Sequence, residues 1–375
     1  MKKQFISLLF IIAFFTISGL IHAQGMTVSG ILDSSLQATA GDAPGFSLGM
    51  EEYANIRFQS KIRDRAAVYG AVNLIAATGN YAANAAEMAA FGVGSSLNST
   101  SYVYGENYVA GIELERLYFR LLGESVSFDG GLMRLPFGYG QVWGSSDFLN
   151  PRNPLIPDAR LRAILGMAFF WYPTEETKLL TFYSAPRDPL SQKSGGSFAG
   201  LSFDKHWSKA SMQTLYSFET PKENSINGIH RAGLSVKADL VLGLVIDALY
   251  TYNHEAKTRL DGLSFSGGAD YSFFNGKLIF LAEYLYNGKN SSTAFNLETN
   301  LLGLPNTHYL YTSLTLRFTD YTNMSAAVIV GFDDKSFAPI LTLNHDLFQG
   351  ATLIVSAQRP EERYYIVSMK LRLRF

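Results

Sequence analysis

The sequence lacks cysteine, is poor in charge, and contains few long apolar runs. With no cysteine in 375 residues, the chain can hold neither a disulfide framework nor a thiolate metal site. Charged residues make up 17% of the chain and the formal net charge is −1, so we expect no nucleic-acid partner. After residue 23, no segment approaches the about 20 apolar residues that a membrane-spanning helix needs. These absences argue against a disulfide-rich domain, a nucleic-acid binder and a bundle of membrane helices.

Aromatic residues, by contrast, are abundant. The chain has 21 Tyr and 27 Phe, and aromatics reach 14% in total. A chain rich in aromatics and free of cysteine suits a barrel that turns one face to lipid and the other to water. The length allows one large domain or two ordinary ones, and no internal repeat or dividing linker is evident.

The first 23 residues have the pattern of a secretory signal peptide. Lys2 and Lys3 form a positive start, an uncharged and mostly apolar run covers 5–21, and Ala23 offers a small residue for cleavage. The alternative is a retained anchor helix, but about 17 residues is short for a membrane span. We therefore expect residues 1–23 to be removed and residues 24–375 to form the mature protein.

From Gly25 onward the apolar residues follow a period of two rather than 3.6. In residues 263–273, for example, every second residue is mostly Leu, Phe, Ala or Tyr, while Ser and Asp stand among the others. Such segments run for about 10–14 residues, the length of a tilted membrane strand. The pattern predicts an all-β fold, an antiparallel up-and-down transmembrane barrel of about 18 strands, with 16 also compatible. The expected strands lie near 26–34, 47–62, 65–77, 106–121, 125–135, 161–172, 176–185, 197–206, 210–219, 228–238, 240–253, 260–273, 276–287, 307–318, 323–332, 336–345, 351–358 and 363–375.

The connections between these strands are of two kinds. Some are short turns, such as those at Arg63–Asp64, Gly123–Glu124 and Trp207–Lys209. Others are long, notably 78–105, 136–160 and 288–306. Bacterial barrels join their strands by short periplasmic turns and longer external loops, so this mixture supports the barrel prediction. Residues 78–105, rich in Ala, Asn, Ser and Gly, predict a surface loop.

The last predicted strand has the clearest alternation. One face carries the residues Tyr365, Val367, Met369, Leu371, Leu373 and Phe375. The other face carries Lys370, Arg372 and Arg374. An amphipathic strand with a final aromatic resembles the β-signal that the outer-membrane assembly machinery recognises. That resemblance implies Phe375 as an assembly signal, and the barrel assembly machinery and outer-membrane lipid as partners. The alternative is the last strand of a soluble sandwich.

A barrel of about 18 strands is wide enough for an aqueous lumen, so the polar strand faces decide the function. Basic and acidic side chains on these faces would set up a field that favours polar solutes. The alternative is that each merely solvates the lumen or pairs with a neighbour. The pore-lining candidates on the strands are Arg57, Lys61, Glu113, Glu115, Lys370, Arg372 and Arg374.

The segment from Arg134 to Arg162 is the most unusual loop. Its four prolines stiffen it, its glycines permit tight bends, and its apolar and aromatic content argues against disorder. With the strand pair before it, the segment resembles porins, in which a Pro-Phe-Gly turn leads into a loop with Asp and Asn-Pro; here these are residues 136–138, Asp147 and 150–151. The resemblance covers about 50 residues, and the Gly-Arg pair of that pattern is absent. We hypothesise that the loop folds inward and narrows the pore; an external cap is the alternative. Its charged pore-lining candidates are Asp147, Arg152, Asp158 and Arg160.

Enzymatic chemistry has little support in the sequence. His206 and Ser208 stand two residues apart, as in barrel phospholipases, but without the flanking motif. The other histidines of the mature chain have no metal-ligand spacing, and no glycine-rich phosphate loop is present. We therefore expect no catalytic residues, no metal and no cofactor.

Together these patterns predict a porin of the outer membrane of a diderm bacterium. It would be a passive water-filled channel for the diffusion of small polar or anionic solutes. A substrate-specific transporter of apolar compounds, and an adhesin or structural barrel, remain as alternatives. Whether the protein forms a homo-oligomer stays open.

Overall fold

The computed structural model describes residues 25–41, 45–62, 65–80, 101–105, 107–150, 163–186, 196–221, 228–253, 262–288, 307–361 and 364–375. The expected signal peptide lies outside these ranges, and so do Arg152, Asp158 and Arg160. In the ranges described, no helix has the length and apolar character needed to cross a membrane.

Strands make up almost all of the regular structure in the described chain, because alternating apolar and polar residues suit a sheet with one face to lipid and one to water. A 3-10 turn, η2 (Phe274–Gly276), lies between β13 and β14. The strands are β1 (Met26–Gly41), β2 (Phe46–Ile62), β3 (Ala66–Gly79), β4 (Ser101–Gly105), β5 (Tyr108–Leu122), β6 (Val126–Met133), β7 (Ile164–Thr174), β8 (Thr177–Ser184), β9 (Phe198–His206), β10 (Ala210–Glu219), β11 (Ile229–Asp239), β12 (Gly243–Asn253), β13 (Leu263–Phe273), β14 (Leu278–Asn287), β15 (His308–Thr319), β16 (Thr322–Gly331), β17 (Phe337–Phe348), β18 (Ala351–Glu361) and β19 (Tyr364–Arg374).

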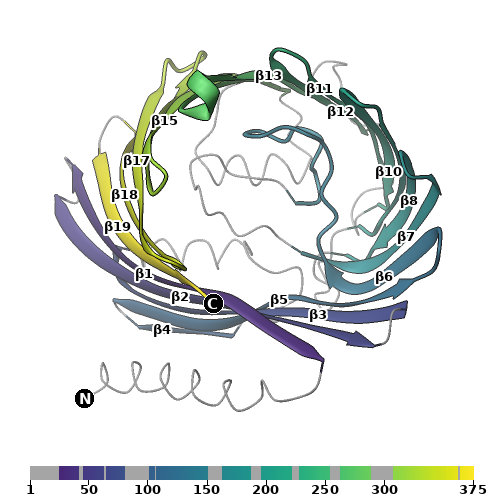
Figure 1. The fold of residues 1–375 in the computed structure, drawn as a ribbon, viewed down its shortest axis with the longest axis horizontal. Coiled ribbons are helices and arrows are strands. Elements are labelled where there is room, and N and C mark those ends of the chain that lie inside the picture. The colour runs from purple at the N-terminus through teal and green to yellow at the C-terminus, as the bar shows by residue number, and fades with distance from the viewer. Residues whose placement is uncertain are drawn as a thin grey trace.

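The sheet closes on itself into a barrel (Figure 1). β1 pairs antiparallel with β2 on one side and with β19 on the other, so the first and last strands meet at a seam. Beyond β19, Gly30 and Phe375 exchange backbone hydrogen bonds of 2.8 and 3.2 Å. Eighteen strands follow one another round the barrel, which confirms the predicted architecture. Closure leaves no sheet edge to be exposed to lipid.

The short strand β4 is the one that the sequence reading missed. It forms a hairpin with β5 and pairs with residues 108–112, whereas β6 pairs with β5 only at 117–122. β4 therefore extends the sheet beside β5 where β6 does not reach. The prediction of a strand-free loop over 78–105 was wrong at its last five residues, because compositional bias toward Ala, Asn and Ser hides a segment this short.

Two other boundaries differ from the prediction. β1 continues to Gly41 rather than ending at residue 34, since small residues on its outer face from Ala38 onward weaken the apolar contrast that marks a strand. Residues 240–242 form a turn instead of the start of β12. Leu240 and Val241 continue the apolar pattern, but they are exposed at the end of the barrel.

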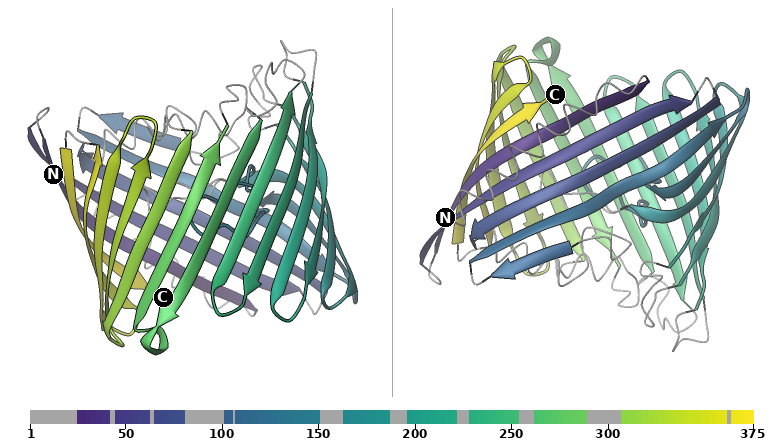
Figure 2. Two further views of the ribbon diagram at one scale, coloured as in Figure 1. Left: turned by 90° about the horizontal axis from the view of Figure 1, so that it is seen from above. Right: turned by 90° about the horizontal axis from the view of Figure 1, so that it is seen from below.

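The connections at the two ends of the barrel differ in length. One end, called here the turn end, holds the short connections 63–65, 123–125, 175–176, 207–209, 240–242, 274–277, 320–321 and 349–350. The strands joined by the long connections, such as 134–163 and 288–307, meet the opposite, loop end, and so do those joined by the short connections 42–45, 332–336 and 362–363. Phe375 lies at the turn end (Figure 2). The strand bounds agree with the predicted mixture of short turns and longer loops, and all of the long connections join strands at the loop end.

The outer surface carries exposed aromatic side chains near both ends and aliphatic side chains between them. Near the loop end they include Phe46, Tyr183, Tyr216, Tyr252, Phe337 and Tyr365. Near the turn end they include Trp171, Tyr172, Trp207, Phe273, Phe318, Tyr321, Phe348 and Phe375. Aromatic belts at two levels with an apolar band between them are the pattern of a barrel that crosses a membrane.

Candidate pore and its inward loop

Residues 134–150, here called the inward loop, leave β6 at the loop end and enter the barrel (Figure 1). Their contacts lie on the far wall. The backbone N–H groups of Gln141, Val142 and Trp143 all donate to the carboxylate of Glu283 in β14, each at 3.0 Å. The Trp143 indole N–H also donates to the Glu283 backbone carbonyl at 3.0 Å. Glu283 is thus the main polar anchor of the inward loop.

A second carboxylate binds the part of the inward loop just before Gln141. Asp247 in β12 accepts hydrogen bonds from the backbone N–H groups of Tyr139 (3.0 Å) and Gly140 (2.8 Å). The N–H of Gly138 donates to Oε1 of Gln213 in β10 at 2.6 Å. Hydrogen bonds from N–H groups to carboxylates are about twice as strong as neutral ones, so these wall residues fix the path of the loop.

Apolar contacts reinforce the same path. Phe137, Phe148 and Leu149 of the loop belong to one buried cluster with inward residues of β7 to β12, such as Phe182 and Leu249. Val142 and Trp143 belong to a second cluster with Leu285, Tyr309, Ile329, Ala338 and Ile340 of β14 to β17. These inward apolar side chains therefore pack together with the loop instead of facing open water.

Glycine is required at Gly138 for two reasons. Its φ is +83°, which side chains disfavour. A Cβ there would also stand 2.1 Å from Ser146 Oγ and 2.6 Å from Asp247 Oδ2. Gly144, with φ +52°, makes a second bend. The glycines that the sequence marked as bend points therefore shape the loop at the place where it meets the wall.

Asp147, a predicted pore-lining residue, is buried inside the inward loop. Its Oδ1 accepts the N–H of Asn150 at 3.0 Å, and its own N–H donates to the Gly144 carbonyl at 2.9 Å. The predicted assignment of Asp147 to the pore surface was therefore wrong. Its side chain stabilises the fold of the loop, because a short polar side chain can hydrogen-bond to backbone a few residues away.

On the wall made by β1 and β19, the predicted basic residues do face the lumen. Arg372 makes a bidentate pair with Asp33 of β1, at 2.8 and 2.7 Å. Lys370 approaches the same carboxylate at 3.8 Å, and Arg374 donates to Thr352 Oγ1 at 3.2 Å. Asp33, which was not among the candidates predicted from the sequence, partly neutralises the positive charge of Lys370 and Arg372.

Glu113 and Glu115 of β5 are both buried and both engaged. Glu113 accepts from Asn73 at 3.1 Å. Glu115 lies at a β-bulge and contacts Arg134 at 3.0 Å and Arg116 at 3.2 Å. The polar contacts on this wall thus join Glu115 to the base of the inward loop through Arg134.

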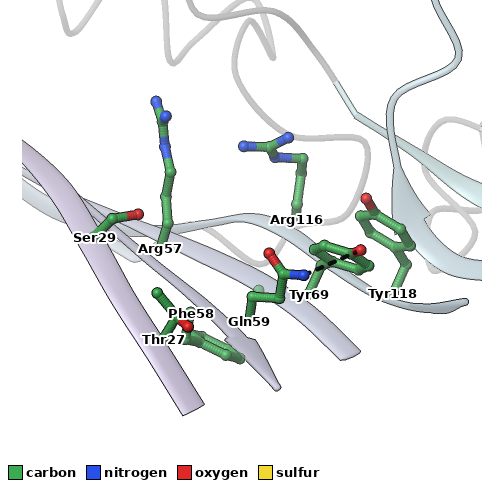
Figure 3. Close-up of a pocket in the computed structure, with 9 residues that line it drawn as sticks. Thr27, Ser29, Arg57, Phe58, Gln59, Tyr69, Arg116 and Tyr118 are labelled. Atoms are coloured by element: carbon green, nitrogen blue, oxygen red, sulfur yellow. Dashed lines mark hydrogen bonds between the residues drawn. The ribbon is translucent and has the colours of Figure 1, made fainter. Parts of the chain in front are cut away.

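Arg57 and Lys61 of β2 lie on the inner face toward the turn end, and both are exposed. Figure 3 shows Arg57 and Arg116 projecting to the same side of a cleft. The remaining cleft residues include Ser29, Gln59 and the stacked pair Tyr69 and Tyr118, whose ring centroids are 4.9 Å apart. Among the described residues, Arg57, Lys61 and Arg374 form no ion pair.

The residues that hold the loop, Asp247, Glu283 and Gln213, were not selected from the sequence. The period of two predicts that these residues lie on inward faces. It does not predict their hydrogen-bond partners in the inward loop, which are 75 to 142 residues away in the sequence. The described residues contain no cluster of His, Asp and Glu that could hold a metal ion. His206 hydrogen-bonds Ser211 at 2.9 Å.

Comparisons with known proteins agree on the fold. No protein-family model and no curated protein matches the chain. Among solved structures, Pseudomonas aeruginosa OccK8 (OprE) aligns with a TM-score of 0.58 and 11% identity, covering 93% of this chain and 98% of that one. Acinetobacter baumannii OccAB4 gives a TM-score of 0.57 and 9% identity, over 94% and 99%. A mutant of the Rh. blastica porin gives 0.50 and 12%, over 93% and 100%. The chain therefore has the fold of outer-membrane porins.

Proposed function

We propose that the protein is a porin that lets small polar or anionic solutes diffuse across an outer membrane. The observation that carries this proposal is the contrast between the two sides of the lumen. Inward apolar residues between β7 and β17 pack in clusters with the inward loop, whereas Arg57, Lys61 and Arg374 on the opposite side stay exposed. Exposed basic side chains on a pore wall favour anions over cations.

The inward loop supports a size limit for this passage. It is anchored at Asp247 and Glu283, which lie near the middle of β12 and β14. A loop held at mid-height narrows the water-filled path there. The apolar inner wall does not favour a transporter of apolar compounds, since Phe137, Phe148 and Trp143 of the loop itself occupy it.

Conductance of the purified full chain in planar bilayers tests the proposal. We expect stepwise openings and, in a salt gradient, a reversal potential that favours the anion. The double variant Arg57→Gln and Arg374→Gln should lower the anion-to-cation permeability ratio several-fold, toward one. Lys205→Gln is the matched control, because this lysine pairs with Glu176 at the turn end, away from the lumen. Absence of openings would refute the channel, and an unchanged ratio would refute the role of the basic side chains.

Deleting residues 144–158 tests the constriction separately. The deletion removes Phe148 and Leu149, which hold the loop to the wall. We expect single-channel conductance to rise, because a shorter loop obstructs less of the lumen. Unchanged conductance in a folded barrel would show that the narrowest point lies elsewhere.

A further inference from the structure

The short turns at the turn end differ in polarity around the rim. The turn 123–125, between β5 and β6, carries the exposed Glu124, and the turn 175–176 consists of two exposed glutamates. Across the barrel from β5 (Figure 1), the turn 240–242 between β11 and β12 reads Leu-Val-Leu, and all three side chains are exposed. Turns usually carry Gly, Asn, Asp, Ser or Pro, and a run of exposed apolar residues is unfavourable in water unless it has a partner.

This apolar turn is part of a larger surface. Gly243 of β12 stands opposite Asp270 of β13, so the turn 240–242 runs beside the last residues of β13. The rings of Tyr271, Phe273 and Phe274 follow one another there, with centroids 4.5 and 6.4 Å apart. We call this surface the rim patch and define it by Leu240, Val241, Leu242, Tyr271, Phe273 and Phe274.

Phe274 occupies its position against the preference of its backbone. It opens η2, the green coil at the turn end in Figure 2, with φ +52°, and Asn275 follows with φ +55°. Bulky side chains seldom adopt this region, which suits Gly, Asn and Asp. Such backbone outliers cluster at functional positions. The ring is 74% exposed, so packing within its own chain does not account for its presence there.

The lipid-facing band continues directly into the rim patch. Leu244 and Ile246 of β12 are exposed on the outer wall next to the turn, and Phe273 belongs to the aromatic belt of the turn end. Lys277, just after η2, is exposed. A lysine beside aromatic rings can lay its stem on apolar surface while its ammonium group reaches lipid phosphates. This continuity favours phospholipid over a periplasmic protein as the partner of the rim patch.

We propose that the rim patch is immersed in the inner leaflet of the outer membrane and contacts its phospholipids directly. The barrel is then anchored more deeply at β11 to β14 than at β5 to β8, whose turns carry glutamates that must stay in water. Aromatic side chains favour the level of the headgroups, which suits the rings of the rim patch. This inference does not depend on what passes through the pore.

The absence of cysteine allows a single thiol to report the depth of each turn. Val241→Cys lies in the rim patch, and Ser125→Cys in the turn between β5 and β6 is the matched control. The purified full chain is labelled with a polarity-sensitive fluorophore and placed in vesicles of phosphatidylcholine and phosphatidylglycerol. We expect nitroxide-labelled lipid to quench the probe at 241 several-fold more than the probe at 125, and iodide to quench it several-fold less. Equal quenching at both positions would overturn the proposal.

Outer-membrane fragments separate lipid from a protein partner. In the fragments and in the vesicles, a polyethylene-glycol maleimide modifies the thiols that water reaches and shifts the chain on a gel. We expect Val241→Cys to react several-fold more slowly than Ser125→Cys in both preparations. Slow reaction in the fragments with fast reaction in the vesicles would mean that a protein covers the rim patch, and would overturn the assignment to lipid.

Phe274→Asn tests the ring itself, because Asn accepts the positive φ of this position. In the Val241→Cys background, we expect iodide quenching to rise several-fold, toward that of Ser125→Cys. Phe274→Trp, which keeps an interfacial ring, should leave quenching near the parent value. The faster gel migration of unboiled barrels verifies that each variant is folded. A folded Phe274→Asn variant with unchanged quenching would contradict the role of Phe274.

Discussion

Asp33 and Arg372 join the two strands that close the barrel. Their side chains are largely buried and share two hydrogen bonds across the seam. We expect Asp33→Ala to lower the free energy of unfolding by about 2 kcal/mol, the order of a hydrogen bond to a charged group. Urea titration in lipid vesicles measures the change.

The double variant provides the control for this pair. Asp33→Ala leaves the Arg372 guanidinium without its carboxylate. Replacing Arg372 by Ala as well removes this unpaired charge and should restore part of the lost stability. If the two single substitutions add in the double variant, Asp33 and Arg372 do not interact across the seam.

Gly30 gives a second prediction at the same seam. A Cβ at Gly30 would stand 2.5 Å from Cζ of Phe375 and 2.6 Å from the Asn55 carbonyl oxygen. We expect Gly30→Ala to cost roughly 1–3 kcal/mol, as overpacking does. Gly267→Ala is the control, since its Cβ would meet nothing nearer than 3.4 Å. Equal unfolding free energies for the two variants would contradict this reading.

Single residues also mark what the sequence could predict. The period of two placed Lys370, Arg372 and Arg374 on the inner face, and the structure agrees. It could not predict that Asp33 would meet Arg372, because those residues are 339 positions apart and the register of the closing pair is set by the whole barrel.

Among the elements, the inward loop depends most on one wall residue. Glu283→Ala would leave three backbone N–H groups of the loop without their acceptor. Such loss costs about 1–3 kcal/mol for each buried group that water does not reach. We expect the loop to detach, with larger and noisier single-channel currents.

Fluorescence can follow this detachment. Trp143 is 4% exposed, whereas Trp171 and Trp207 lie on the outside. In a Trp171→Phe and Trp207→Phe background, Glu283→Ala should raise acrylamide quenching of Trp143 several-fold. Asp270→Asn, which alters the carboxylate that accepts from the Gln141 side chain but leaves Glu283 in place, should leave quenching near the parent value. Equal quenching in all variants would mean that Glu283 does not hold Trp143 and its neighbours against the wall.

The elements were predictable where alternation is strong and unpredictable where it is weak. Most of the strands fall within a few residues of their expected bounds. The end of β1 and the whole of β4 were missed, because small or biased residues carry little apolar contrast. The inward course of the loop was hypothesised from its glycines and prolines, but Glu283 and Asp247 were not identified as its anchors. Those contacts are set by which strands stand opposite one another.

For the whole molecule, the aromatic belts predict where the barrel sits in a bilayer. Trp171 and Trp207 belong to the belt at the turn end, while Trp143 is enclosed by the barrel. We expect lipids brominated near the headgroup to quench Trp171 and Trp207, each studied as the single tryptophan, more than lipids brominated near the chain end. Trp143 should be quenched by neither. Strong quenching of Trp143 would contradict a barrel that encloses it.

The anchoring of the inward loop also constrains the order of folding. The hydrogen bonds of Val142 and Trp143 reach Glu283, about 140 residues further along the chain. The carboxylates of Asp247 and Glu283 take their places on the inner wall only after β12 and β14 have paired with their neighbours. Because distant contacts form only after the intervening chain is arranged, docking of the loop is a late step. The loop therefore leaves the lumen unobstructed until β12 and β14 are in place.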